Sequence, residues 1–182
     1  FYYCFGCQAK GDAISFLMDC ENLSFMEAIE DLAGEAGMTV PARDSAMQQL
    51  TDTRTELSEV MEKAVRYFRM MLKSREGAET TTYLERRGLP LSTQDEFGLG
   101  YALGDRKALF TTLTEQGVTA EQLIESGMCI KPDDGGQPYD RFRNRVMFPI
   151  RDARGRCIAF GGRALEASAK AKYLNSPETI LF

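Results

Sequence analysis

Apolar residues recur at helical spacing in the first part of the chain. Ser24 and Glu27 form an S-x-x-E capping box, and the apolar positions in residues 25–36 then repeat every three or four residues. A longer apolar stripe covers residues 53–73. Asp12 is a suitable N-cap for a shorter helix directly after it. The pattern therefore predicts three helices in this part of the chain.

The apolar period disappears between the second and the third of these helices. Residues 41–52 begin with Pro41 and carry no regular apolar repeat, which indicates a linker. We therefore place a domain boundary there and assign residues 41–55 to the linker.

The remaining sequence changes from helical to strand-like patterns after Gly127. Thr119 and Gln122 form a further capping box. Four short helices are predicted before the change, at residues 79–87, 92–97, 107–116 and 120–126. Strand-like runs follow at residues 128–131, 145–150 and 156–160. Helices followed by strands predict an α+β fold.

The composition is that of a globular domain and part of another. The chain has 182 residues, of which 43% are hydrophobic and 27% charged, and it contains no histidine or tryptophan. No stretch approaches the roughly 18 apolar residues of a membrane span, and no signal peptide is recognisable. The five cysteines are an odd number, which argues against a disulfide scaffold. We therefore expect a soluble cytoplasmic protein, and we interpret the chain from Phe1 to Phe182 as an internal fragment.

The net charge of −5 is unevenly distributed. Residues 1–138 carry 13 Lys/Arg and 23 Asp/Glu, whereas residues 139–182 carry 9 and 4. An anionic partner is therefore expected at the C-terminal end of the chain.

Cys4 and Cys7 form a C-x-x-C knuckle, one of two places that carry chemistry. Such a knuckle aims two thiolates at one metal ion about 2.3 Å away. Structural zinc takes four ligands, and the chain has neither a histidine nor a second C-x-x-C. On the residues alone, a redox motif and a pair of buried thiols remain alternatives. Cys20, Cys129 and Cys157 lie within apolar patterns and are predicted to be core residues.

The second place is an alternating row of arginines, Arg141, Arg143 and Arg145. On one extended strand the three side chains project to the same face and repel one another unless an anion bridges them. Phosphate suits the bidentate geometry of guanidinium groups. The alternative is a solvated sheet face with Asp140 and Asp152 as partners.

Two short runs downstream add to this basic stretch. A Gly-Gly-Arg run ends at Arg163, and its glycines either allow a backbone to approach a ligand or form a β-bulge. Lys172, Tyr173 and Asn175 supply a cation, an aromatic face and an amide side by side. This combination is typical of sites for nucleotides or single-stranded nucleic acids.

Five segments carry a resemblance to a known family. They read F-Y-Y-C-F-G-C at residues 1–7, Y-L-E-R-R-G-L at 83–89, Y-D-R-F-R-N-R-V-M-F-P-I at 139–150, G-G-R at 161–163 and K-Y-L-N-S-P-E-T at 172–179. In this order, and over nearly the whole chain, they resemble the zinc-binding and RNA polymerase domains of bacterial replicative DNA primases of the DnaG type.

The resemblance implies a division into domains. The expected α+β architecture has the C-terminal helical part of a zinc-ribbon-type domain at residues 1–40 and the linker at residues 41–55. The N-terminal subdomain of the RNA polymerase core follows at residues 56–182, with helices first and then a basic, mainly antiparallel sheet. The Toprim subdomain, whose carboxylates hold Mg²⁺ in the family, is absent from this fragment.

The resemblance also assigns site residues. Cys4 and Cys7 are expected to be ligands of a Zn²⁺ site that a Cys and a His further upstream complete in the family, so the site is incomplete here. No catalytic residue is expected in the fragment. The positions that match the family's groove for single-stranded template and incoming nucleotide are Arg87, Arg141, Arg143, Arg145, Arg163, Lys172, Tyr173 and Asn175.

The function implied is that of a DNA primase, which makes short RNA primers on single-stranded DNA. The fragment is expected to bind template and nucleotide without polymerising, because the Mg²⁺-binding carboxylates belong to the missing half. Expected partners are single-stranded DNA, ribonucleoside triphosphates, guanosine alarmones and, for the full-length protein, the replicative helicase, with no membrane. The alternatives are a non-catalytic module that binds single-stranded nucleic acid or nucleotides, and part of a phage primase-helicase.

Overall fold

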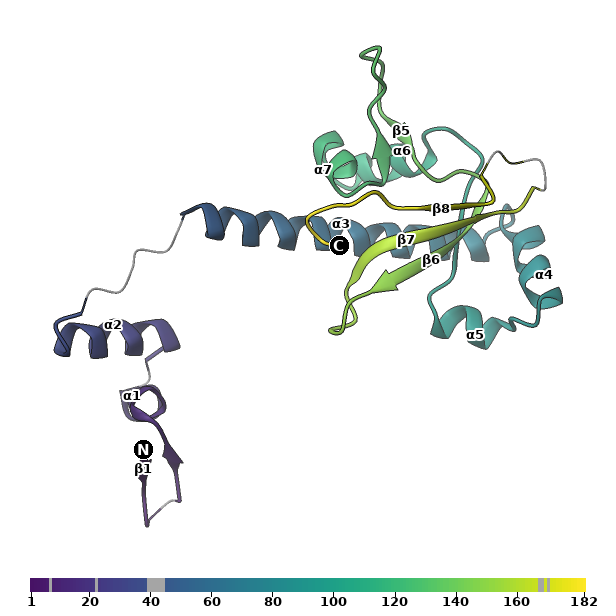
Figure 1. Cartoon of the computed structure of the whole chain (residues 1–182). Coiled ribbons are helices and arrows are strands. Elements are labelled where there is room, and N and C mark those ends of the chain that lie inside the picture. Colours follow the sequence, from purple (N-terminus) through teal and green to yellow (C-terminus); the bar gives the residue numbers. More distant parts are fainter. Residues whose placement is uncertain (7, 22, 39–44, 167–168, 170) are drawn as a thin grey trace. The chain divides into compact units, whose positions relative to one another are not determined.

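The computed structural model describes residues 1–182 except 7, 22, 39–44, 167–168 and 170, and it describes residues 45–47 by their backbone only. The chain forms two compact units, Phe1–Gln48 and Gln49–Phe182 (Figure 1). Within the described residues, no helix combines the length and the apolar character that crossing a membrane requires. The division into domains at residues 40 and 55 stays a prediction.

The N-terminal unit consists of a short antiparallel hairpin followed by two helices. Its elements are β1 (Tyr2–Tyr3), β2 (Lys10–Gly11), α1 (Ala13–Glu21) and α2 (Phe25–Glu35). Both helices begin where the sequence predicts. The Asp12 carboxylate accepts the backbone N–H of Ser15 at 2.8 Å, and the capping box of Ser24 and Glu27 is complete.

The N-terminal unit buries little apolar surface. Ala28 is its only fully buried residue among those described, and the side chains of Phe16 and Phe25 are 44% and 54% exposed. Cys20 is also exposed, so the prediction that it is a core residue is wrong. The apolar positions of α1 are spaced as for a core, but among the described residues of this unit none of them is fully buried.

Helix α3 (Ser45–Lys73) begins earlier than the sequence predicts. Residues 45–52, which were assigned to the linker, are helical. They lack an apolar period, but they contain no glycine or proline and are rich in residues with good helix propensity. Extending an existing helix costs far less than nucleating one, so the apolar stripe that follows is sufficient to support this first part.

The other helices of the C-terminal unit lie within a residue or two of their predicted positions. They are α4 (Ala78–Arg86), α5 (Leu91–Glu96), α6 (Ala108–Glu115) and α7 (Ala120–Glu125). The predicted capping box of Thr119 and Gln122 is complete at the start of α7. Local sequence signals therefore determine these elements.

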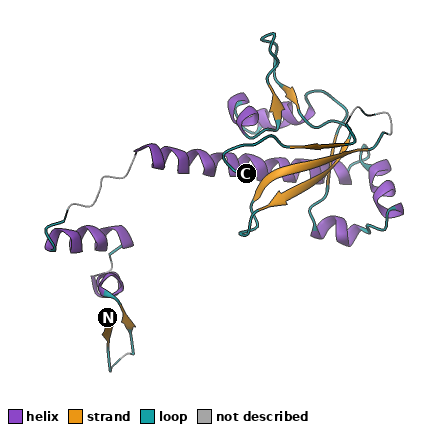
Figure 2. Ribbon diagram, in the orientation of Figure 1, coloured by secondary structure: helices purple, strands orange, loops and turns teal. Residues whose placement is uncertain are grey.

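A four-stranded antiparallel sheet lies beside α3 (Figure 2). Its strands, in spatial order, are β3 (Gly100–Ala102), β6 (Arg145–Arg151), β7 (Cys157–Ala164) and β8 (Tyr173–Asn175). A separate antiparallel pair consists of β4 (Cys129–Ile130) and β5 (Tyr139–Asp140). The α+β fold with an antiparallel sheet is therefore as predicted, although β3, β5 and β8 were not anticipated.

Helix α3 supplies the centre of the main core. Its apolar stripe is buried as predicted, and the Phe68 ring meets the Phe160 ring of β7 edge to face, with the ring centroids 5.3 Å apart. Cys129 and Cys157 belong to the same core, and burial raises the pKa of both thiols, to about 12 for Cys157. These two cysteines are structural, as predicted.

A second, smaller core covers the other face of the sheet. Tyr101 of β3 and Val146 of β6 pack there against Leu84 of α4 and Leu72 at the end of α3. This second core covers β3 and β6. On the neighbouring strands β7 and β8, part of the same face of the sheet remains accessible.

Candidate nucleic-acid interface

The register of the sheet decides which of the predicted site residues share a face. Val146 lies opposite Arg163, which lies opposite Tyr173, and two positions along the strands Gly161 lies opposite Asn175. Side chains alternate between the two faces of a strand, so all of these positions belong to the same face. Arg163, Tyr173 and Asn175 therefore lie together at the accessible side of β7 and β8.

This face is open where the three side chains meet. The Tyr173 side chain is 66% exposed, Asn175 is exposed and Arg163 is half-buried. A Cβ added at Gly161 would lie 3.5 Å from the Asn175 amide oxygen. Because Gly161 has no side chain, nothing projects from the sheet beside the Asn175 amide, and a planar group can approach that amide.

Two aromatic rings hold cations at this face. The guanidinium carbon of Arg163 lies 5.1 Å from the ring centroid of Tyr83 on α4, and Lys172 Nζ lies 5.9 Å from the ring centroid of Tyr173. Tyr83 was not among the predicted site residues. No local signal identifies it, because its contact joins α4 to a strand about eighty residues later in the chain.

The prediction that Arg141, Arg143 and Arg145 project from one strand is wrong. Strand β5 ends at Asp140, and β6 starts only at Arg145. Between them the backbone of Asn144 adopts a left-handed conformation, with φ of 51°. An alternating pattern places side chains on one face only along an uninterrupted strand, so the alternation does not place these three arginines on a common face.

Arg145 holds the backbone of the connection between β7 and β8. Its Nη2 donates to the carbonyl oxygen of Ala171 at 2.8 Å, and its Nη1 lies 3.3 and 3.4 Å from the carbonyl oxygens of Gly162 and Lys172. Burial lowers the pKa of this guanidinium, and the positive charge of Arg143 lowers it further. Arg145 therefore acts on the site mainly through the backbone that it positions.

Arg141 and Arg143 also donate to backbone carbonyl groups. Arg141 Nε donates to the Asn175 carbonyl oxygen at 3.1 Å, which brings these two predicted site residues together at β8. Arg143 donates to the carbonyl group three residues before it and lies 5.2 Å from the ring centroid of Tyr139. Arg106 stacks on the same ring at 4.4 Å, although the sequence pattern did not single it out.

None of these predicted cations is neutralised by a carboxylate within the described part of the chain. The salt bridges found there join Arg69 and Lys73 to Asp95, Arg151 to Glu62, and Arg156 to Asp152. The carbonyl oxygens and rings that orient the cations of the basic end are neutral. We name this group the sheet-end cluster, and its members are Arg141, Arg143, Arg145, Arg163 and Lys172.

The carboxylate of Asp140 is not a partner of these arginines either, although its backbone carbonyl group accepts from Arg143. Its buried carboxylate accepts the backbone N–H groups of Leu109 and Phe110, at 2.8 and 2.9 Å, and so ties β5 to the first turn of α6. Burial raises the pKa of this carboxyl group to about 6, against the opposing effect of the two hydrogen bonds. The residue anchors the segment from which Arg141 reaches β8.

Arg87 remains apart from the sheet-end cluster. It forms the C-cap of α4, and its side chain is exposed. Its backbone N–H donates to the Tyr83 carbonyl oxygen at 3.2 Å, so it follows one turn after the ring that holds Arg163. Among the described residues its guanidinium forms no hydrogen bond, salt bridge or cation–π contact with the other predicted site residues.

The metal site can be judged only from Cys4. Its thiol is exposed just after β1, its backbone N–H donates to the Ala9 carbonyl oxygen at 2.8 Å, and the second predicted ligand, Cys7, lies outside the described residues. An accessible thiol at the end of a tight hairpin suits a zinc ligand. However, the described residues contain no group of three or more potential ligands. The two cysteines therefore supply at most half of a structural zinc site.

Two family models together match most of the chain. The model "CHC2 zinc finger" matches residues 1–49, and "DNA primase catalytic core, N-terminal domain" matches residues 67–182. Among the curated proteins, the DNA primase of Pseudomonas putida is 45% identical over all of this chain. The chain spans only 28% of that relative's length.

Solved structures give the same family. "Structure of the DnaG primase catalytic domain bound to ssDNA" matches with a TM-score of 0.68 and 38% identity, over 72% of this chain and 42% of that one. The zinc-binding and RNA polymerase domains of the Aquifex aeolicus primase match with a TM-score of 0.62 and 32% identity, over 99% of this chain and 42% of theirs. Both units of the chain thus have counterparts in one solved protein.

Proposed function

The chain belongs to the DnaG-type bacterial DNA primases, and we propose that it supplies the template- and nucleotide-binding part of such an enzyme. The activity proposed for the whole protein is the synthesis of short RNA primers on single-stranded DNA. The observation that carries this proposal is the sheet-end cluster, whose cations are oriented by neutral groups. A similar catalytic domain has been solved with single-stranded DNA, which supports the choice of ligand.

The sheet-end cluster, together with the neighbouring side chains of Tyr173 and Asn175, suits the two kinds of group that a single strand presents, its phosphates and its bases. Phosphates interact with the uncompensated cations, of which Arg141, Arg163 and Lys172 surround the start and end of β8. The exposed ring of Tyr173 offers a base a stacking surface, and the Asn175 amide can donate to or accept from a base edge. Arg145 keeps the backbone around Lys172 in place for these contacts.

In primer synthesis a 3′ hydroxyl attacks an α-phosphate and pyrophosphate leaves. Mg²⁺ ions stabilise the attacking and leaving oxygens in such reactions, and we assign their ligands to the Toprim subdomain of the whole protein. The residues of the sheet-end cluster are proposed to position the triphosphate and to offset the negative charge on its departing oxygens. The isolated chain is therefore proposed to bind without polymerising.

The remaining partners follow from the same assignment. Cys4 and Cys7 are proposed to bind Zn²⁺ together with two ligands from outside this chain. Ribonucleoside triphosphates and guanosine alarmones are proposed to share the sheet-end cluster, with Arg87 at its margin. The replicative helicase is proposed as a partner of the full-length protein.

The experiment that tests the proposal is a binding titration. Fluorescence anisotropy measures the affinity of labelled single-stranded DNA, and of a labelled guanosine nucleotide, over a series of salt concentrations. The double variant Arg163→Ala, Tyr173→Ala is compared with Arg75→Ala, which removes an exposed arginine from the turn after α3.

We expect the unmodified chain and the Arg75 variant to bind alike, with affinity falling as salt rises, and the double variant to lose most of its affinity. Equal binding by all three proteins would refute the assignment of the sheet-end cluster. In a parallel reaction with Mg²⁺ and ribonucleotides no primer is expected, and a primer made by the isolated chain would contradict the division of labour.

A further inference from the structure

A second group of arginines lines a cavity away from the sheet-end cluster. The cavity has a volume of about 310 Å³ and lies where the first half of α3 meets the β6–β7 turn and the C-terminal segment. We name it the α3 pocket. Its lining residues are Thr51, Arg54, Thr55, Ser58, Arg154, Arg156, Ile158 and Leu181.

The helix contributes a polar face to this pocket. Thr51, Arg54, Thr55 and Ser58 stand at positions i, i+3, i+4 and i+7, so they follow one side of α3. This side runs beside the apolar stripe of the helix, and three of its four members carry hydroxyl groups. Hydroxyl groups and arginines are among the side chains that contact phosphate oxygens in nucleic acids.

Two of the arginines are held in place before any ligand arrives. Arg54 Nε donates to the carbonyl oxygen of Ile180 at 2.8 Å, which fixes the plane of its guanidinium group. Arg156 donates through Nε and Nη2 to one carboxylate oxygen of Asp152, at 2.8 and 2.7 Å. An oriented guanidinium group loses less side-chain entropy on binding an anion than a mobile one does.

The charge inside the pocket is positive. The Arg154 guanidinium has no hydrogen-bond or salt-bridge partner among the described residues, and the Arg54 guanidinium is held by a neutral carbonyl group only. Among the described residues, none of those that line the pocket carries a carboxylate side chain. Glu59 and Glu62 line the neighbouring cavity, and Glu62 is engaged by Arg151 at 2.8 Å. An anion placed in the pocket therefore meets at least two unpaired positive charges.

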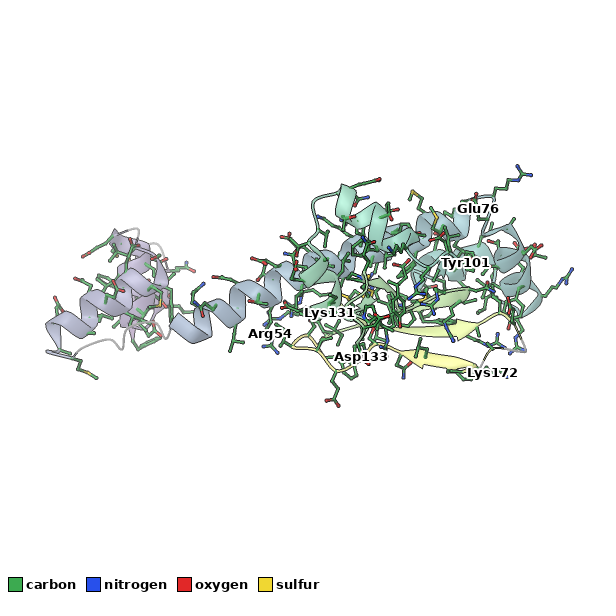
Figure 3. The ribbon with its side chains drawn as sticks, turned by 90° about the horizontal axis from the view of Figure 1, so that it is seen from above. Arg54, Glu76, Tyr101, Lys131, Asp133 and Lys172 are labelled. Carbon is green, nitrogen blue, oxygen red and sulfur yellow. The ribbon has the colours of Figure 1, made fainter. Side chains whose placement is uncertain are left out.

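The α3 pocket and the sheet-end cluster lie at different ends of the C-terminal unit. Figure 3 shows Arg54 and Lys172 well apart, with the length of the sheet between them. Arg156 and Arg163 are seven residues apart at the two ends of β7, which corresponds to about 23 Å of extended strand. One ligand reaches both places only if it is a chain of several units.

We propose that the α3 pocket binds a backbone phosphate of a single-stranded nucleic acid whose other part lies on the sheet-end cluster. The proposal rests on the proposed function for the identity of the strand, but the residues that carry it are separate. It adds a second anchoring point that fixes the course of the strand over this unit. A short oligonucleotide fills one site, whereas a longer one engages both.

The test compares single-stranded DNA of about 4 and about 16 nucleotides, which bracket the usual lengths of single-strand sites. Arg154→Ala and Arg154→Glu alter the pocket at an exposed turn residue whose side chain makes no hydrogen bond with another described residue, so folding is not at risk. Arg75→Ala is the matched control. A labelled ribonucleoside triphosphate is titrated in parallel to separate a strand phosphate from a free nucleotide.

We expect Arg154→Ala to weaken binding of the longer strand about three- to fivefold at low salt and to reduce the slope of log affinity against log salt by about 0.7, the loss of one phosphate contact. Arg154→Glu should weaken it further, and the 4-nucleotide strand should bind all proteins alike. An equal loss for both lengths, or none for the longer one, overturns the proposal. A loss confined to the triphosphate overturns it as well.

The outcomes also separate this proposal from the previous one. If the Arg163, Tyr173 double variant binds normally while Arg154→Glu does not, the sheet-end assignment fails and the α3 pocket stands as a strand site. If the unmodified chain binds no single-stranded DNA of either length, both proposals fail together.

Discussion

The buried carboxylate of Asp140 should make the stability of the C-terminal unit depend on pH. The pKa of this group is about 6 in the folded chain, and its ordinary value is 3.8. Between these values the folded chain holds a proton that the unfolded chain has released. The contribution to the free energy of unfolding is therefore fully present below about pH 4 and is lost as pH rises through 6.

The size of the effect follows from the difference between the two pKa values. Each pKa unit corresponds to about 1.4 kcal/mol, so a shift of about two units amounts to about 3 kcal/mol between pH 4 and pH 7. Asp140 is only 3% exposed, so solvent does little to screen this effect. The lowered pKa values of Asp95 and Asp152, in the same unit, act in the opposite direction, since stability from those groups is lost as pH falls.

The assay is urea unfolding followed by circular dichroism at several pH values from 4 to 8. Asp140→Asn removes the titration and keeps the shape of the side chain, so the difference in unfolding free energy between variant and unmodified chain isolates this one group. We expect the difference to change by about 3 kcal/mol over this range, in favour of the variant as pH rises. Asp133→Asn, at an exposed turn, is the control. A difference between Asp140→Asn and the unmodified chain that stays constant with pH would show that burial does not perturb this carboxyl group.

Three further substitutions test the scaffold, each by urea unfolding. Arg145→Ala removes the donors that hold the backbone at Ala171 and should cost about 1.5 to 3 kcal/mol, with faster amide hydrogen exchange in the β7–β8 connection; unchanged exchange would contradict the role of the side chain. Gly100→Ala places a methyl group 2.4 Å from Phe68 Cβ and should cost about 1 to 3 kcal/mol, and a stable variant would show that α3 moves freely away from β3. Thr119→Ala removes the cap of α7 and should cost about 1 kcal/mol, whereas no loss would mean that the cap is dispensable.

The helices could be predicted because their signals are local. The capping boxes at Ser24 and Thr119 and the apolar stripe of α3 lie within the segments that they define, and the structure confirms all three. The early start of α3 escaped prediction because its first residues depend on the helix that follows. The prediction that Cys20 is a core residue was wrong for the opposite reason, because local spacing does not reveal whether a second layer of the fold covers a helix.

The short strands and the arrangement of the site residues could not be predicted from local sequence signals. Strands β3 and β8 have three residues each and exist through their pairing with β6 and β7. The left-handed backbone conformation of Asn144 separates Arg143 from Arg145. The alternation of arginines in the sequence does not indicate this break. The contacts of Arg163 with Tyr83 and of Arg141 with β8 join distant parts of the chain.

Arg141, Arg145 and Arg163 nevertheless contact or belong to the same two strands, β7 and β8, and the partners that the fold provides for them are neutral. Elsewhere in the described structure cations such as Arg69 and Arg151 meet carboxylates, and a ligand would have to break an ion pair to use them. At the sheet end, carbonyl oxygens and aromatic rings fix the direction of each guanidinium group without reducing its charge. Burial lowers the pKa of the Arg145 guanidinium, and the positive charge of Arg143 lowers it further because the two like charges repel each other. A bound phosphate relieves the repulsion and displaces no carboxylate, so the arrangement favours an anionic ligand over the empty state.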